Sequence, residues 1–240
     1  MNPILIALDV DTPDQAFTMA DRLRGVVGGY KINTHLFTGA GPDVVREFVR
    51  RGDRVFLDLK FHDIPNTVAG AVAAAAALGV WMVNVHASGG PAMLEAARRG
   101  AEEGAKKAGV TRPLVTAVTV LTSLDAATLQ ALGIDESPIE HVVRLARLAQ
   151  RAGLDGVVAS PNEVRAIREA CGDSFVIVTP GIRGGSARHG ADDQQRTATP
   201  AGAIEAGSSY LVIGRPITAA PDPRAAAEAI AREIAEARHT

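Results

Sequence analysis

The chain has 240 residues, a formal net charge of −2 and 47% hydrophobic residues, which is enough for one large core. This balanced charge, without a run of basic and aromatic residues, argues against a nucleic-acid partner. The one cysteine, Cys171, excludes an internal disulfide and predicts a reducing, cytoplasmic location. We expect no membrane span, because the apolar tract 68–80 is too short, and no signal peptide, because Met1 leads directly into a strand.

Apolar runs that predict β-strands alternate along the chain with segments of helical spacing. The predicted strands are residues 4–9, 28–33, 54–60, 80–86, 113–121, 156–160, 175–179 and 210–214. The predicted helices are residues 15–24, 36–51, 64–78, 91–108, 125–132, 138–152, 162–171, 201–206 and 222–238. Such alternation implies parallel strands joined by helical crossovers. We predict one α/β domain over residues 1–240, a (β/α)8 TIM barrel. A doubly wound open sheet is the alternative, without a Gly-x-Gly-x-x-Gly motif to support it.

Polar or charged side chains follow nearly every predicted strand. In a barrel enzyme the active-site residues lie at the carboxyl ends of the strands. The residues at these ends are Asp9, Lys31, Asp58 with Lys60, Asn84 with His86, Thr122 with Ser123, Ser160, Thr179, and Gly214 with Arg215. One polar strand end would only reflect the emergence of a strand into water, but this set predicts a built site.

The predicted strand over residues 54–60 carries an acid and a base on one face. Residues two apart in a strand point the same way, so Asp58 and Lys60 project together. A surface ion pair is the plain alternative for such a pair. Lys31 should converge on the same rim, where alternating charges tolerate partial burial and keep a lysine protonated. A protonated lysine beside a carboxylate can act as a general acid. The interleaved lysines oppose a Mg²⁺ site, and we expect no metal.

Two stretches that contain glycine and arginine predict a phosphate site. One is residues 180–185, which include Arg183, and the other is Gly214-Arg215-Pro216. Barrels commonly bind phosphate between the loops after strands 7 and 8, and the guanidinium groups would make charge-assisted contacts. The polar stretch 181–199 is long enough to close as a lid, from which Gln194 could reach the phosphate. Ordinary turns with solvated arginines are the alternative.

Four further polar residues have more than one interpretation. Asp9 could bind a sugar hydroxyl or cap the first helix. We interpret His35, His62 and His86 as structural residues, because a lone histidine at a strand end is more often a hydrogen-bonding residue than a catalyst.

Seven stretches of the chain resemble the orotidine 5′-phosphate decarboxylase family. The most specific is Asp58-Leu59-Lys60-Phe61-His62-Asp63-Ile64-Pro65-Asn66-Thr67. The others are Ala7-Leu8-Asp9, Asn84-Val85-His86-Ala87-Ser88-Gly89-Gly90, Leu121-Thr122-Ser123, Thr179-Pro180-Gly181-Ile182-Arg183, Asp193-Gln194 and Ile213-Gly214-Arg215-Pro216. They occur in the family's order from the first strand to the last, so the resemblance covers essentially the whole chain.

The resemblance implies conversion of orotidine 5′-phosphate to UMP and CO₂, the last step of de novo UMP synthesis. It also implies that the enzyme uses no cofactor or metal and forms a homodimer with shared active sites. Lys60 would protonate C6 of the pyrimidine, and Asp58 would sit against the substrate carboxylate. Lys31 and the partner subunit's Asp63 would complete the charge network.

The resemblance also implies which residues bind this small-molecule substrate. They are Asp9, Lys31 and the partner subunit's Thr67 near the ribose, Thr122 at the pyrimidine, Arg183, Gln194 and Arg215 at the phosphate, and Gly214 beside Arg215.

The chain departs from the family pattern after the second predicted strand. The family has a Lys-Val-Gly-like run there, whereas this chain has Asn33 and His35 after its lysine. This departure puts the contacts of that loop in question but removes no implied catalytic residue.

Two other functions stay open. Mg²⁺-dependent hexulose-phosphate synthases and sugar-acid-phosphate decarboxylases share the Asp-x-Lys-x-x-Asp motif, but they lack the continuation seen at residues 61–67. A non-catalytic barrel that binds nucleotides is the third possibility, although a pure binder has no use for an alternating charge array.

Overall fold

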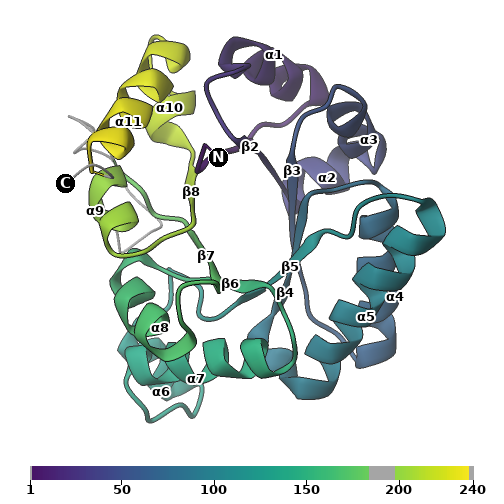
Figure 1. The fold of residues 1–240 in the computed structure, drawn as a ribbon, viewed down its shortest axis with the longest axis vertical. Coiled ribbons are helices and arrows are strands. Elements are labelled where there is room, and N and C mark those ends of the chain that lie inside the picture. The colour runs from purple at the N-terminus through teal and green to yellow at the C-terminus, as the bar shows by residue number, and fades with distance from the viewer. Residues whose placement is uncertain (1, 184–197, 238–240) are drawn as a thin grey trace.

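A closed barrel of parallel strands forms the centre of the molecule (Figure 1), described here from a computed structural model for residues 2–183 and 198–237. The strands pair in sequence order, and β8 closes the barrel onto β1. The predicted (β/α)8 barrel is confirmed, and closure excludes the open sheet. The strands are β1 Ile4–Ala7, β2 Gly29–Asn33, β3 Val55–Phe61, β4 Met82–His86, β5 Leu114–Val118, β6 Gly156–Val158, β7 Val176–Thr179 and β8 Tyr210–Ile213.

Helices form a ring around the barrel, in which α11 lies beside α1 (Figure 1). The helices of the described ranges are α1 Pro13–Leu23, α2 Thr34–Ala40, α3 Asp43–Arg50, α4 Pro65–Ala77, α5 Gly90–Ala108, α6 Ala126–Ala131, α7 Pro138–Arg151, α8 Val164–Cys171, α9 Pro200–Glu205, α10 Arg215–Thr218 and α11 Pro223–Ala237. Short 3-10 turns, η1 Ala87–Gly89 and η2 Pro161–Glu163, lead into α5 and α8.

Two predicted elements differ most from the structure in their bounds. The spacing predicted one helix over 36–51, but Gly41 ends α2 with a φ of 70° and Pro42 precedes α3. Glycine adopts this left-handed conformation readily, and a residue before proline is disfavoured in the helical one, so the helix stops here. The fifth strand ends at Val118 rather than at 121, which places Thr122 in the following loop.

The start of α1 settles one question about Asp9. The hydroxyl of Thr12 accepts a hydrogen bond from the backbone N–H of Gln15, and the Gln15 side chain accepts one from the backbone N–H of Thr12. This reciprocal capping box is a common helix start. Thr12 is therefore the N-cap of α1, and the interpretation of Asp9 as the cap of this helix is wrong.

The barrel encloses a core of its own, separate from the larger core between the strands and the helices. Phe56, Met82 and Val178 are fully buried inside it. Near its amino end, the rings of Trp81 and Tyr210 meet edge to face with centroids 4.9 Å apart, a favourable aromatic geometry. Side chains therefore fill the barrel interior toward the amino ends of the strands, and the cavity lies at their carboxyl ends.

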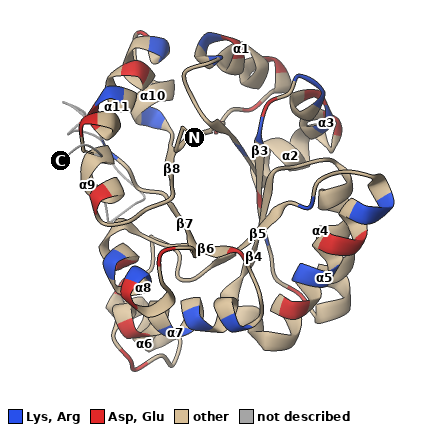
Figure 2. Cartoon of the chain, in the orientation of Figure 1, with Lys and Arg blue, Asp and Glu red and all other residues tan. Residues whose placement is uncertain are grey.

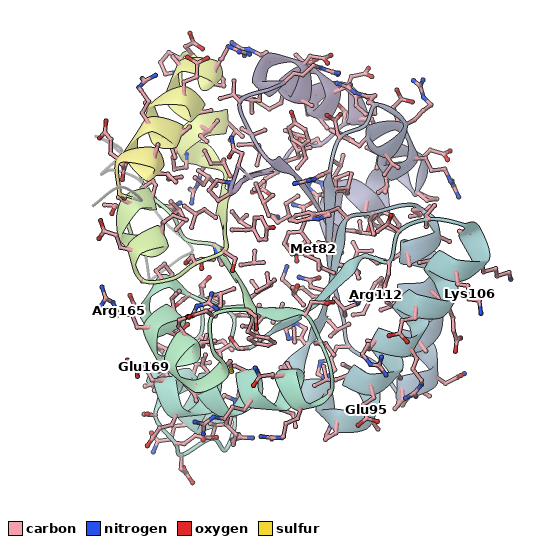
Figure 3. The ribbon with its side chains drawn as sticks, in the orientation of Figure 1. Met82, Glu95, Lys106, Arg112, Arg165 and Glu169 are labelled. Atoms are coloured by element: carbon pink, nitrogen blue, oxygen red, sulfur yellow. The ribbon has the colours of Figure 1, made fainter. Side chains whose placement is uncertain are left out.

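Charged residues lie mainly on the outer helices (Figure 2). Glu95 and Lys106 extend from the ring into solvent, whereas Met82 lies toward the barrel (Figure 3). Exceptions include Lys31 of β2 and Asp58 of β3, which are buried. No helix in the described ranges combines the length and apolar character that a membrane crossing requires.

The pair α4 and α5 depends on two glycines. A Cβ atom at Gly100 would lie 2.3 Å from the carbonyl oxygen of Ala69, and one at Gly104 would lie 2.3 Å from that of Ala73. Real Cβ atoms do not approach backbone oxygen so closely, so only glycine permits this helix spacing.

We expect Gly100→Ala to destabilise the fold by about 1–3 kcal/mol, because the added methyl group must push the two helices apart. The control is Gly39→Ala in α2, where a Cβ would meet nothing within 4 Å; it should stabilise by about 0.5–1 kcal/mol through helix propensity. Urea unfolding monitored by circular dichroism measures both. Equal midpoints for the two variants would contradict the proposed packing constraint.

Candidate active site

A cavity of about 260 Å³ opens at the carboxyl end of the barrel strands. Its lining includes the predicted site residues Lys31, Asp58, Lys60, Thr122, Arg183, Gly214 and Arg215. The apolar part of the wall comes from Phe56, Val118 and Val158, among others. The structure thus gathers seven residues that the sequence placed at five different strand ends or loops.

A row of alternating charges forms one side of the cavity. One carboxylate oxygen of Asp58 lies 2.6 Å from Nζ of Lys60, and the other lies 3.3 Å from Nζ of Lys31. Nζ of Lys31 is also 3.6 Å from an oxygen of Asp9. The Asp58 side chain is only 9% exposed and that of Lys31 only 11%. The alternative of a surface ion pair between Asp58 and Lys60 is therefore wrong, because the acid is buried although the Lys60 side chain is 35% exposed.

The carboxyl group of Asp58 stays ionised although it is buried. Burial alone raises its pKa, but the nearby charges of Lys31 and Lys60 and hydrogen bonds from Lys60 and Asn84 outweigh burial and hold the pKa below its usual range. A depressed pKa means that the ionised form stabilises the fold above about pH 4, the unfolded value, and that this stabilisation is lost as the pH falls through the lower folded value.

The backbone of β3 departs from the regular alternation that the sequence predicted. Residues as far as Asp58 follow it, but the register with β4 shifts between Leu57 and Phe61. Lys60 has a φ of 51°, the one positive value outside glycine in the described ranges. A left-handed conformation at such a residue costs on the order of 1–3 kcal/mol and clusters at functional sites. This bulge sets the position from which the Lys60 side chain meets Asp58.

Asn84 is a site residue to which the sequence assigned no role. It is fully buried on β4; its Nδ2 donates to Asp58 at 2.7 Å, and its Oδ1 accepts from the Lys60 backbone N–H at 2.8 Å. Its place at a strand end among polar residues was the available signal. Its contacts depend on the bulge in β3, which the alternation pattern does not reveal.

Asn33 accounts for the departure after the second strand. Its Oδ1 accepts a hydrogen bond from the backbone N–H of Leu36 and so caps α2, while its Nδ2 donates to Asp9 at 2.9 Å. Asp9 is mostly exposed and is not part of the cavity lining, but it contacts the lining residue Lys31 and lies 3.6 Å from a Cβ built on Gly214. One side chain therefore starts a helix and orients Asp9. His35 is exposed and lies 3.6 Å from Asp11.

The other end of the cavity carries two arginines. Arg183 follows Gly181, whose φ is 78°, and its backbone N–H donates to Ala198 at 2.8 Å. Arg215 opens the short helix α10. Both line the same cavity, as expected for a phosphate end. Gln194 and most of the predicted lid lie outside the described residues.

Two predicted site residues stand apart from the cavity. Asp63 and Thr67 are exposed and do not contribute to its lining. Asp63 accepts a hydrogen bond from the backbone N–H of Ile64 at 2.6 Å, and Ile64 is 66% exposed. Within one chain the structure does not bring these residues to the charge row.

Two histidines stack near Lys60. The rings of His62 and His86 are 5.4 Å apart between centroids and inclined by 29°. Burial, together with the nearby His62 and Lys60, lowers the pKa of His86, so its neutral form is favoured. No cluster of three or more His, Cys, Asp and Glu side chains in the described ranges is arranged as a metal site.

The closed barrel and the charged cavity at the carboxyl ends of its strands define the class as a barrel enzyme acting on a small molecule. The family model described as Orotidine 5′-phosphate decarboxylase / HUMPS family matches residues 2–230. The chain belongs to this family.

Named relatives agree with the family. The Orotidine 5′-phosphate decarboxylase of Moorella thermoacetica is 57% identical over 232 residues, which cover 96% of this chain and 91% of the relative. That of Halorhodospira halophila is 57% identical over 234 residues, covering 98% and 96%. The crystal structure of Orotidine 5′-phosphate decarboxylase from Lactobacillus acidophilus has a TM-score of 0.87 and 41% identity, covering 98% of this chain and 99% of that one.

We expect Lys31→Met to raise the pKa of Asp58, because it removes one of the two lysine charges that oppose the effect of burial. Carboxyl ¹³C NMR over an acid pH titration measures the change. Arg46→Met is the control, since Arg46 pairs with Asp43 on exposed α3. A pKa of Asp58 that is equal in the Lys31 variant and in the control would contradict the assigned role of Lys31.

Proposed function

We propose that this chain converts orotidine 5′-phosphate to UMP and CO₂, the last step of de novo UMP synthesis, and that it does so without a metal or cofactor. The observation that carries the proposal is the buried Asp58 carboxylate, which is held between Lys31 and Lys60 on the wall of the cavity. Family membership and relatives named Orotidine 5′-phosphate decarboxylase support this substrate.

The cavity has a separate region for each part of the substrate. Arg183 and Arg215 bind the phosphate through charge-assisted hydrogen bonds. Asp9 and Lys31 hold the ribose hydroxyls, and Thr122 contacts the pyrimidine. Phosphate binding far from the reacting carbon can supply free energy that brings the pyrimidine against the charge row. The substrate carboxylate then lies beside Asp58.

The reaction replaces the bond between C6 and the carboxylate carbon with a C6–H bond. The bond between C6 and the carboxylate carbon breaks, CO₂ leaves, and the electron pair stays on C6. Lys60, held as an ammonium beside Asp58, donates a proton to C6 and is reprotonated from solvent. Repulsion between Asp58 and the substrate carboxylate is present before the bond breaks and is relieved as CO₂ departs, so it lowers the barrier.

The parent protein should consume orotidine 5′-phosphate in the presence of excess EDTA. The loss of ultraviolet absorbance of the substrate measures the reaction. Lys60→Ala should lower kcat by about 10²–10⁴-fold, because it removes the general acid. Lys106→Ala, on exposed α5, is the control and should match the parent.

A parent protein without turnover would rule out the decarboxylase function. Activity that disappears with EDTA, together with aldol chemistry on a pentulose phosphate, would instead favour a Mg²⁺-dependent synthase.

A homodimer with shared sites is the second part of the proposal. The chain leaves Asp63, Ile64 and Thr67 exposed in one continuous segment that follows β3 directly. A second copy that covered this segment would bury the apolar Ile64 side chain and could bring an acid to the other subunit's cavity. We also propose that the chain is a single domain. Because its one cysteine, Cys171, cannot form an internal disulfide, we propose that it acts in the reducing cytoplasm.

Mixing two inactive variants tests the shared sites. In a heterodimer of Lys60→Ala and Asp63→Ala chains, one of the two sites has both residues intact. Random subunit exchange should therefore restore about one quarter of the parent activity. Mixing Lys60→Ala with Asp58→Ala is the control, and it should restore nothing, because both residues serve the same subunit's site. Exchange without recovery in the first mixture would contradict sharing.

A further inference from the structure

The amide of Asn84 joins the two reacting groups of the charge row. Its Nδ2 donates to the same Asp58 oxygen that receives the hydrogen bond from Lys60 Nζ, at 2.7 Å and 2.6 Å respectively. Its Oδ1 accepts from the backbone N–H of Lys60 at 2.8 Å. Asn84 is 0% exposed and does not line the cavity. It can therefore act on the substrate only through Asp58 and Lys60.

The Lys60 backbone needs an external contact to hold it. Its φ of 51° is left-handed, and the ladder between β3 and β4 is interrupted between Leu57 and Phe61. A strained residue persists only where its surroundings determine its conformation. In the interrupted ladder, the Asn84 side chain supplies an acceptor for the Lys60 N–H, so a side chain replaces a lost backbone contact.

We propose that Asn84 is a positioning residue for the decarboxylation: its one amide fixes the Asp58 carboxylate and the turn at Lys60 relative to each other. The inference rests on the proposed function, because it assigns Asn84 a part in that reaction. The amide nitrogen donates to the Asp58 carboxylate, and the amide oxygen accepts from the backbone N–H of Lys60. A planar amide cannot shift one contact without the other, so the distance between acid and ammonium is coupled to the backbone.

The hydrogen bond from Asn84 also favours the ionised form of Asp58. It acts beside the charged groups that face the carboxylate, namely Lys31 from β2 and Lys60 from β3. Asp9 reaches the row through Lys31, and His86 of β4 is electrostatically coupled to both Asp58 and Lys60. Burial raises the pKa of Asp58, and the hydrogen bond from Asn84 opposes this effect. Loss of the Asn84 donor should therefore raise the pKa of Asp58.

Two substitutions separate a positioning role from ordinary filling of the core. Asn84→Asp keeps an acceptor for the Lys60 N–H but replaces the donor with a second carboxylate. Asn84→Leu keeps the branching and the number of side-chain heavy atoms, although it is larger, and removes both contacts. Thr116→Val is the matched control, because Thr116 is the fully buried polar partner of Asn84 in register on β5 and contacts neither Asp58 nor Lys60.

The experiment measures kcat, KM and the pH profile of kcat/KM with orotidine 5′-phosphate, and the Kd of UMP by calorimetry. We expect both Asn84 variants to lower kcat by about 10–100-fold, as the loss of an orienting contact does. KM and the Kd of UMP should stay within about twofold of the parent, because phosphate and ribose contacts remain. The acid limb of kcat/KM should move to higher pH, and Thr116→Val should leave all four quantities unchanged.

Two results would overturn the inference. One is a folded Asn84→Asp protein whose kcat and acid limb match the parent. The other is a parallel loss of kcat and UMP affinity with an unmoved acid limb, since general damage to the fold predicts that pattern. Should Asn84→Leu fail to give a native circular dichroism spectrum, Asn84→Asp decides alone. An inactive parent would contradict the proposed function, whereas an active parent with unaffected variants contradicts only this inference.

Discussion

The active site depends on one carboxylate, that of Asp58, which stays ionised although it is buried. Burial of Asp58 opposes its charge, and two lysines on neighbouring strands overcome that opposition. Lys31 is buried together with the acid, and without the lysines the burial of Asp58 would raise its pKa less opposed. The barrel makes the arrangement possible, because parallel strands end at one rim and bring residues distant in sequence within a few ångströms.

This arrangement requires a strained backbone in β3. A regular strand would carry Asp58 and Lys60 on the same face, but here the strand bulges and Lys60 takes a left-handed conformation. The Asn84 amide, buried on the next strand, contacts both parts of the bulge. Strain and its support occur together at the point where charge is concentrated, which is typical of functional sites.

The sequence predicted the barrel and the charge row, because strand ends are visible as polar residues after apolar runs. It did not predict the bulge at Lys60 or the contacts of Asn84, since alternation describes only regular strands. The division of the helix over 36–51 could have been expected from Gly41. The role proposed for Asp63 depends on a second subunit, because within the described residues of one chain its exposed side chain lies outside the cavity lining.

The glycine-lined contact between α4 and α5 has a consequence for the proposed homodimer. Asp63 directly precedes the N-cap of α4 and Thr67 lies in its first turn, and the axis of α4 is fixed by close backbone contact with α5 at Gly100 and Gly104. Such a contact has almost no compliance, unlike one made through long side chains. In the proposed homodimer with shared sites, a small change in the core of one subunit would therefore displace Asp63 and Thr67, and the catalytic defect would appear in the other protomer.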